Sequence, residues 1–122
     1  MQQGFEPYPD IVAATREAGA EVTVTTDAAE AVDGADAVYT DVWASMGQES
    51  EATVRRESFA PYRVDETLFG RAAADAIFLH CLPAHRGDEV TGEVMDHDRC
   101  AVWDQAENRM HTEKALLLTL LG

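Results

Sequence analysis

The sequence contains almost no lysine, and its charge is strongly one-sided. Lys114 is the only lysine among nine basic residues, which face 23 acidic residues and leave a formal net charge of −14. Such a charge repels nucleic-acid phosphates, so nucleic acid is not an expected partner. The acids are spread along the chain rather than gathered in a tail. Together these features favour a protein from a high-salt cytoplasm, because salt screens the repulsion.

Other absences exclude further classes of protein. The two cysteines, Cys81 and Cys100, are too few for a disulfide framework, and their spacing matches no zinc ribbon. We expect no membrane span and no secretory signal, because no apolar run is long enough and no basic segment opens the chain. A Gly-rich phosphate loop is also absent, so no nucleotide site is expected. The 122 residues are enough for one cytoplasmic domain with a core.

Short β-branched or apolar runs alternate with helical segments. We expect helices over residues 10–18, 27–32, 66–72, 91–95 and 106–121, and strands over residues 22–25, 37–39, 76–79 and 101–103. Gly19 suits a helix end, and Asp27 with Glu30 resembles a capping box. Strands that alternate with helices predict an α/β fold, a three-layer αβα arrangement around a parallel, Rossmann-like sheet.

Two of the predicted strands run into loops rich in polar groups. Residues 80–87 follow one strand, which Pro83 cannot extend because proline lacks an N–H donor. Residues 41–47 follow the other strand. In an open α/β sheet, ligands bind where the strands end. We therefore expect the two loops to form one site.

These loops carry a resemblance to a known family. Three motifs, at consistent spacing, are similar to the ornithine-binding half of ornithine carbamoyltransferases: Asp41-Val42-Trp43-Ala44-Ser45-Met46-Gly47, His80-Cys81-Leu82-Pro83 and Glu107-Asn108-Arg109. The resemblance runs from about Gly4 to the C-terminus. It implies carbamoyl transfer from carbamoyl phosphate to L-ornithine, giving citrulline and phosphate, without a cofactor and in a trimer-based homo-oligomer.

The resemblance also implies roles in binding the amino acid. Asp41 would bind the ornithine α-ammonium, with Ser45 beside it and Met46 giving a backbone contact, while Gly47 lets the loop fold closely over a ligand. The alternative for Asp41 is a solvated acid at a strand end. For Ser45 and Met46 the alternatives are a turn residue and a core-filling thioether.

Three further residues are implied near the reacting atoms. Cys81 would lie against the δ-amine and help to manage its proton, the Leu82 carbonyl would contact the carbamoyl amide, and Arg109 would stabilise the developing oxyanion. Cys81 and Arg109 are thus the catalytic candidates. The alternatives are an inert buried thiol at Cys81 and a surface arginine paired with Glu113 at position 109.

The roles of the remaining polar residues in the second loop, residues 80–87, are left open. His80, His85 and Arg86 could serve the site or have orienting or structural roles. His80, Cys81 and His85 could in principle hold a metal, but no further ligand is evident, so no metal is predicted. Cys100 is interpreted as a small apolar residue that enters a strand.

The family has a second domain that binds carbamoyl phosphate. Its Arg- and Ser-rich phosphate loop and its His-Pro-Thr-Gln motif do not occur in this sequence. The last helix is apolar on nearly every face from Leu116 to Leu121, which is typical of a helix buried on both sides, and the resemblance implies that it packs on that domain. We therefore expect residues 1–122 to be a single ornithine-binding domain without the first strand of its fold, inactive by itself.

Two other functions compete with this hypothesis. One is a carbamoyltransferase that acts on another amine, such as putrescine, although the loop at residues 45–47 favours an α-amino acid. The other is a non-catalytic remnant that binds a ligand. The sequence leaves open whether the enzyme would serve arginine synthesis or arginine breakdown.

Overall fold

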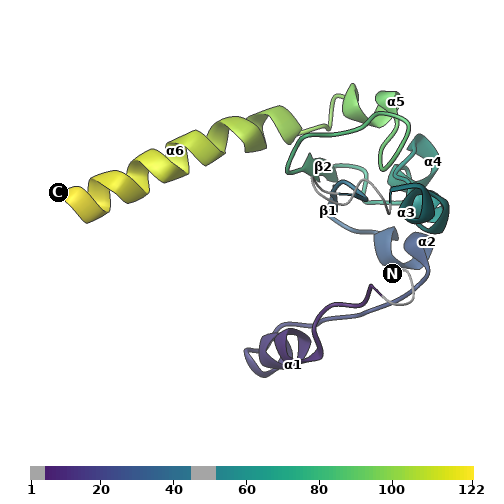
Figure 1. Cartoon of the computed structure of the whole chain (residues 1–122), viewed down its shortest axis with the longest axis horizontal. Helices are drawn as coiled ribbons and strands as arrows, with labels where there is room; N and C mark the ends of the chain where they lie inside the picture. Colours follow the sequence, from purple (N-terminus) through teal and green to yellow (C-terminus); the bar gives the residue numbers. More distant parts are fainter. Residues whose placement is uncertain (1–4, 45–51) are drawn as a thin grey trace.

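The computed structural model describes residues 5–44 and 52–122. In chain order its elements are α1 (Pro9–Glu17), α2 (Ala28–Val32), β1 (Ala37–Thr40), α3 (Ala52–Phe59), the 3₁₀ turn η2 (Ala60–Tyr62), α4 (Glu66–Phe69), β2 (Ile77–His80), α5 (Gly92–Met95) and α6 (Val102–Leu121). Figure 1 shows β1 and β2 inside a body formed with the shorter helices. Helix α6 leaves this body as a long rod, and α1 lies apart from it at the end of an extended arm.

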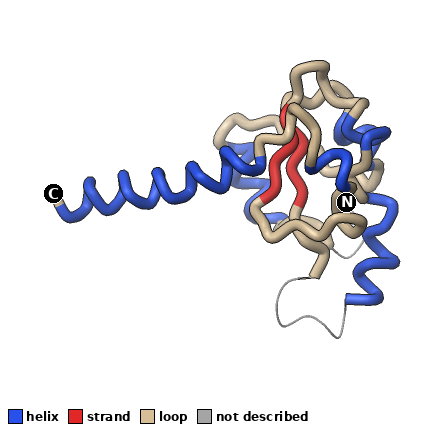
Figure 2. Tube along the Cα trace, turned by 90° about the horizontal axis from the view of Figure 1, so that it is seen from above, coloured by secondary structure: helices blue, strands red, loops and turns tan. Residues whose placement is uncertain are grey.

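The two strands run parallel, side by side (Figure 2), in a register that pairs Ala37 with Ile77 and Thr40 with His80. Each strand is short and contributes one or two buried side chains. Beyond β2, Cys100 adds a single parallel bridge to Phe78. The predicted α/β fold with a parallel sheet is therefore confirmed.

The core lies between the sheet and the short helices. Phe69 and Phe78 meet edge to face with their ring centroids 6.1 Å apart. The Arg99 guanidinium lies 4.5 Å from the Phe69 centroid and donates to the carbonyl oxygens of Ala73 and Ala76. The buried apolar residues are Val38, Val64, Phe69, Ala76, Phe78, Val90, Val94, Met95 and Val102.

Short helices of this body begin at side-chain caps. Asp27 accepts hydrogen bonds from the N–H groups of Ala29 and Glu30, so the predicted helix start there is confirmed. Asp65 caps α4 in the same way, and Thr91 caps α5. Helices of four or five residues are marginal by themselves, so the caps and the tertiary packing must hold them.

Three predicted elements are corrected. Residues 22–25 form no strand in the described structure. They line a hollow of about 610 Å³ that Val38 also lines. The predicted strand at 101–103 is wrong, because α6 already begins at Val102. The helix predicted over 66–72 ends at Phe69, followed by a C-cap at Gly70.

Helix α3 lies in a stretch for which the sequence predicted neither a helix nor a strand. Its sequence, Ala52–Phe59, has a weak apolar stripe and three charged residues, so periodicity gives little signal. Its last residue nevertheless packs on aromatic neighbours: the Phe59 ring lies 4.8 Å from Phe5 and 6.3 Å from Tyr62, centroid to centroid. Tertiary contacts therefore support a helix that the local sequence only weakly encodes.

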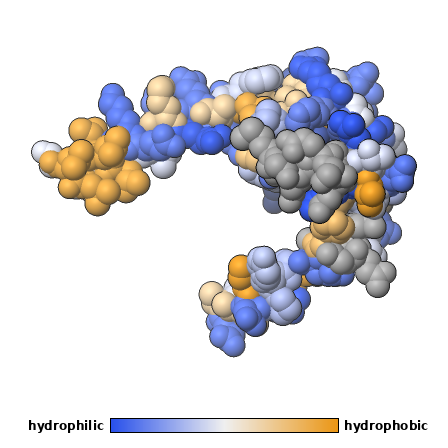
Figure 3. Space-filling view, in the orientation of Figure 1, coloured by the Kyte–Doolittle hydropathy of each residue, from blue (hydrophilic) through white to orange (hydrophobic). Residues whose placement is uncertain are grey.

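Helix α6 starts four residues before the predicted boundary and extends to Leu121, as expected. Val102 is buried, whereas every residue from Glu107 onward is exposed. Figure 3 shows the leucine-rich end as a hydrophobic surface at the tip of the rod. Within the described parts of the chain, no helix is long and apolar enough to span a membrane.

Candidate functional site

The strand register brings Asp41 and Cys81 together. Because Thr40 pairs with His80, the next residues along the two strands leave the sheet side by side. The Cys81 thiol donates to Asp41 Oδ1 at 3.0 Å, and the same oxygen accepts the Val42 N–H at 2.7 Å. The two loops therefore meet at one edge of the sheet, as the sequence predicts.

The Asp41 carboxylate controls the ionisation of the thiol. It raises the pKa of Cys81, chiefly by accepting the thiol hydrogen bond; partial desolvation and the negative charge of Asp41 act in the same direction. A hydrogen bond with the Tyr39 hydroxyl lowers this pKa, but the net change is upward. Cys81 is therefore a neutral thiol near pH 7, suited to donating or sharing a proton and unsuited to attacking as a thiolate.

Arg109 reaches the same loop from α6. Its Nη1 donates to the Cys81 carbonyl oxygen at 2.9 Å. A guanidinium offers five N–H donors, so one bond to this carbonyl leaves the group able to donate to a ligand. We refer to Asp41, Cys81 and Arg109 as the strand-end cluster.

A buried pair holds the backbone of the Cys81 loop. His80 and Glu89 are each 1% exposed, and His80 Nε2 lies 3.1 Å from Glu89 Oε1. His80 Nδ1 accepts the Leu82 N–H at 2.8 Å, so the ring proton must be on Nε2 and points to Glu89. Glu89 Oε1 also accepts the His85 N–H at 2.6 Å. Leu82 sits at φ 58°, a conformation uncommon for leucine, which these bonds help to hold.

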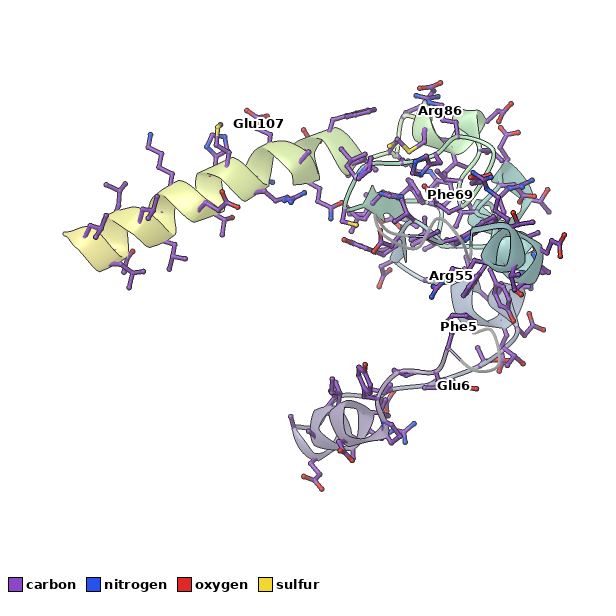
Figure 4. The ribbon with its side chains drawn as sticks, viewed as in Figure 1. Phe5, Glu6, Arg55, Phe69, Arg86 and Glu107 are labelled. Carbon is purple, nitrogen blue, oxygen red and sulfur yellow. The ribbon has the colours of Figure 1, made fainter. Side chains whose placement is uncertain are left out.

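The other charged residues of the loop have different surroundings. Arg86 lies beside α5 (Figure 4) and forms two hydrogen bonds with Asp96, at 2.6 and 2.8 Å. This pairing lowers the pKa of Asp96 and braces the loop against α5. The His85 side chain is exposed, and its Nδ1 is 3.9 Å from Glu89 Oε1. His80 thus has an orienting role, and Arg86 contributes an ion pair at the periphery.

A metal is not needed to explain the arrangement. Ligand atoms of Asp41, His80 and Cys81 lie within 4.8 Å of one another, whereas His85 is not in this group. His80 Nδ1 already accepts from Leu82, and the Cys81 thiol already donates to Asp41. Each of the three groups therefore already has a hydrogen-bond partner within the described chain.

The first loop is described as far as Ala44. Ser45, Met46 and Gly47 lie outside the described residues. Just before them, the Trp43 carbonyl accepts a hydrogen bond from Arg55 Nη1 at 3.3 Å. Arg55 also lies over the Phe5 ring, 5.1 Å from its centroid (Figure 4). Helix α3 thus braces the loop that carries Asp41.

The sequence did not single out three residues that touch this site. Gln105 and Tyr39 hydrogen-bond to each other at 3.3 Å, and Gln105 Oε1 accepts the His80 N–H at 3.0 Å. Glu89 is the third. Gln105 could have been found, because it lies four residues before Arg109 and so on the same face of a helix. Glu89 gave no signal in a chain so rich in acids.

Comparison with known proteins places these features in a family. Residues 1–120 match the family described as aspartate/ornithine carbamoyltransferase, Asp/Orn binding domain. The chain belongs to this family. It is 52% identical over 124 residues to an ornithine carbamoyltransferase of Rhodococcus opacus, covering 98% of this chain and 39% of that protein.

Solved structures agree with this assignment. The ornithine carbamoyltransferase of Pyrococcus furiosus is 48% identical with a TM-score of 0.85, over 95% of this chain and 38% of that chain. The anabolic enzyme of Campylobacter jejuni is 35% identical with a TM-score of 0.89, over 98% of this chain and 41% of that chain. The chain thus spans about two fifths of the length of these relatives.

Proposed function

We propose that this chain is the ornithine-binding part of an ornithine carbamoyltransferase. The reaction moves the carbamoyl group of carbamoyl phosphate to the δ-amine of L-ornithine and yields citrulline and phosphate. The observation that carries the proposal is the convergence of a carboxylate, a neutral thiol and a guanidinium where β1 and β2 end. The similarity to relatives that bear this name supports it.

Asp41 is assigned to the α-ammonium of ornithine. Its side chain is exposed at the edge of the sheet, and Oδ1 is occupied by the Val42 N–H and the Cys81 thiol. Oδ2 is therefore the oxygen that we assign to the ammonium. Ser45 and Met46, which follow on the same loop, are proposed to complete the contacts with the amino acid.

Cys81 is assigned to the δ-amine. The nitrogen must be neutral to attack, and a free alkylamine of this kind has a pKa of about 10.4. The uncharged thiol can hydrogen-bond to the neutral amine without competing with it as a nucleophile. The amine lone pair then forms the C–N bond, the C–O bond to phosphate breaks with its electron pair, and the nitrogen loses one proton to the departing phosphate.

Arg109 is assigned to the carbamoyl oxygen. Negative charge develops on this oxygen as the amine adds, and a donor fixed nearby stabilises it. Losing one such donor costs on the order of 100-fold in turnover. The Leu82 carbonyl, one residue beyond the Cys81 carbonyl that already binds Arg109, is assigned to the carbamoyl amide.

Carbamoyl phosphate also needs a site for its phosphate group. We propose that a separate carbamoyl-phosphate domain or subunit provides it, in a trimer-based assembly. Positioning both substrates supplies much of the rate in a two-substrate transfer. The proposed setting is a cytoplasm of high salt. The net charge of −14 on 122 residues makes the chain repel itself, and salt screens this repulsion.

Ligand binding tests the assignment. Calorimetry in molar potassium chloride should show that L-ornithine binds more tightly than putrescine, which has no α-carboxylate. L-norvaline, which lacks only the δ-amine, should still bind. Tighter binding of putrescine would favour the alternative substrate. Binding of none of the three would reject the proposed function for this chain.

A separate measurement tests the high-salt setting. Thermal melts followed by circular dichroism should give a midpoint that rises from millimolar to molar potassium chloride, since salt screens the repulsion between carboxylates. Potassium chloride suits this purpose better than a sulfate, which would also strengthen apolar burial. A midpoint that stays constant across this range would contradict the high-salt setting.

A further inference from the structure

Gln105 connects α6 to both strands at once. Its side chain is half-buried in the first turn of the helix. The acceptor Oε1 takes the His80 N–H of β2 at 3.0 Å, and the donor Nε2 reaches the Tyr39 hydroxyl of β1 at 3.3 Å. The amide orientation follows from chemistry, because a backbone N–H can bond only to the oxygen of the amide.

The spacing of these contacts matches two successive turns of the helix. Gln105 and Arg109 are four residues apart, so they lie on one face of α6. They hold two successive residues of the other segment, His80 through its N–H and Cys81 through its carbonyl. Arg109 is exposed, and its long side chain has many rotamers to lose when it is fixed. The Gln105 contacts fix the helix from which it extends.

The contact with Tyr39 ties α6 to the first strand as well. Since Gln105 donates to the Tyr39 oxygen, the hydroxyl proton of Tyr39 is free to point elsewhere. Tyr39 is also the residue whose hydrogen bond lowers the pKa of Cys81, opposing Asp41. The Gln105 amide therefore fixes the hydroxyl oxygen of a residue beside the strand-end cluster.

We infer that Gln105 is a positioning residue, which sets α6 against the ends of β1 and β2 and thereby directs Arg109 to the carbamoyl oxygen. This inference rests on the proposed function. Gln105 itself does not contact the substrate in this proposal. Its effect should therefore appear on the carbamoyl end of a ligand and not on the amino-acid end.

Two ligands separate these ends. L-citrulline and L-norvaline share the α-ammonium and the α-carboxylate, but only L-citrulline carries the carbamoyl oxygen. In calorimetry on the whole chain, Gln105→Ala should weaken L-citrulline binding roughly tenfold, about the effect of losing one hydrogen bond to a charged group. L-norvaline affinity should stay within about twofold. Thr112→Ala, an exposed α6 position, serves as the control and should change neither affinity.

The possible outcomes are distinguishable. Equal weakening of both ligands by Gln105→Ala would show a merely structural role and overturn the inference, as would unchanged binding of both. Failure of the unmodified chain to bind either ligand would instead reject the proposed function. Circular dichroism of each variant establishes that it is folded before its affinities are compared.

A second variant separates the two contacts of Gln105. Gln105→Glu keeps an acceptor for the His80 N–H but cannot donate to Tyr39, and its carboxylate would attract the Tyr39 hydroxyl proton. It should keep the preference for L-citrulline over L-norvaline, because the bond to the His80 N–H still holds α6 against β2. Loss of this preference in a folded Gln105→Glu variant would overturn the inference.

Discussion

The two ends of α6 differ sharply in how the rest of the molecule holds them. At its start, Val102 is buried and Gln105 and Arg109 bond to the end of β2. At its far end, Leu117 is 56% exposed and Leu121 is 82% exposed. Polar contacts fix one end, while the other carries apolar surface of the kind that proteins normally cover. The strand-end cluster is therefore built within the described chain, and the distal surface calls for a partner.

The largest effect should come from the buried pair beneath the strand-end cluster. Glu89→Ala leaves the buried His80 Nε2 and the partly buried His85 N–H without their acceptor. Unfolding in urea should show a loss of about 3 kcal/mol. His85→Ala, which removes only an exposed ring, should lose less than about 0.5 kcal/mol. Equal losses in the two variants would contradict the role given to Glu89.

The next effect concerns Asp41, the proposed partner of the ornithine ammonium. Asp41→Asn removes the negative charge, so L-ornithine affinity should fall roughly 10- to 100-fold, which is typical for losing a hydrogen bond between charged groups. Asp10→Asn, on the exposed α1, removes the same charge far from the sheet edge and serves as the control. Unchanged calorimetric affinity in the Asp41 variant would mean that Asp41 is a solvated strand-end acid.

The same substitution should change the pH dependence of the thiol. The pKa of Cys81 is raised in the fold, so the neutral thiol contributes stability below the pKa of an unfolded cysteine, and this contribution is lost as pH rises through the folded pKa. Asp41→Asn should shift this loss, and the onset of iodoacetamide alkylation, to lower pH. An unchanged profile of alkylation rate against pH would contradict an effect of Asp41 on the ionisation of Cys81.

The apolar end of α6 should produce self-association in the isolated chain. Sedimentation at increasing protein concentration in high salt should reveal species heavier than a monomer, because the exposed leucines lower their free energy by pairing. Combining Leu118→Gln with Leu121→Gln should reduce this association, whereas Lys114→Gln should not. A monomer at every concentration would mean that the leucine-rich end is tolerated in water.

The smallest effect should come from the hydrogen bond between Arg55 and the loop that carries Asp41. Arg55→Ala removes the hydrogen bond to the Trp43 carbonyl, and we expect L-ornithine affinity to fall about threefold, which corresponds to a net contribution below 1 kcal/mol. The neighbouring Arg56→Ala breaks an ion pair with Asp88 instead and should leave the affinity unchanged. Equal effects would indicate a general role of α3 in stability.

The sequence predicted the part of the site that depends on strand ends. Polar residues after two parallel strands must meet at one edge, so the approach of Asp41 to Cys81 follows from topology. Spacing places Gln105 on the same helix face as Arg109, but its bonding partners depend on how α6 packs. The burial of Glu89 could not be predicted, since it depends on how the loop packs. Residues 22–25 have strand composition, but composition alone supplies no neighbour with which to pair.

The most direct test of the account is protection of Cys81 by substrate. In a Cys100→Ala chain, iodoacetamide modifies a single thiol, and its rate is measured with increasing L-ornithine in molar potassium chloride. We predict that L-ornithine slows this reaction in the unmodified site and that Asp41→Asn removes the protection. An alkylation rate that L-ornithine leaves unchanged would contradict the claim that the strand-end cluster binds ornithine.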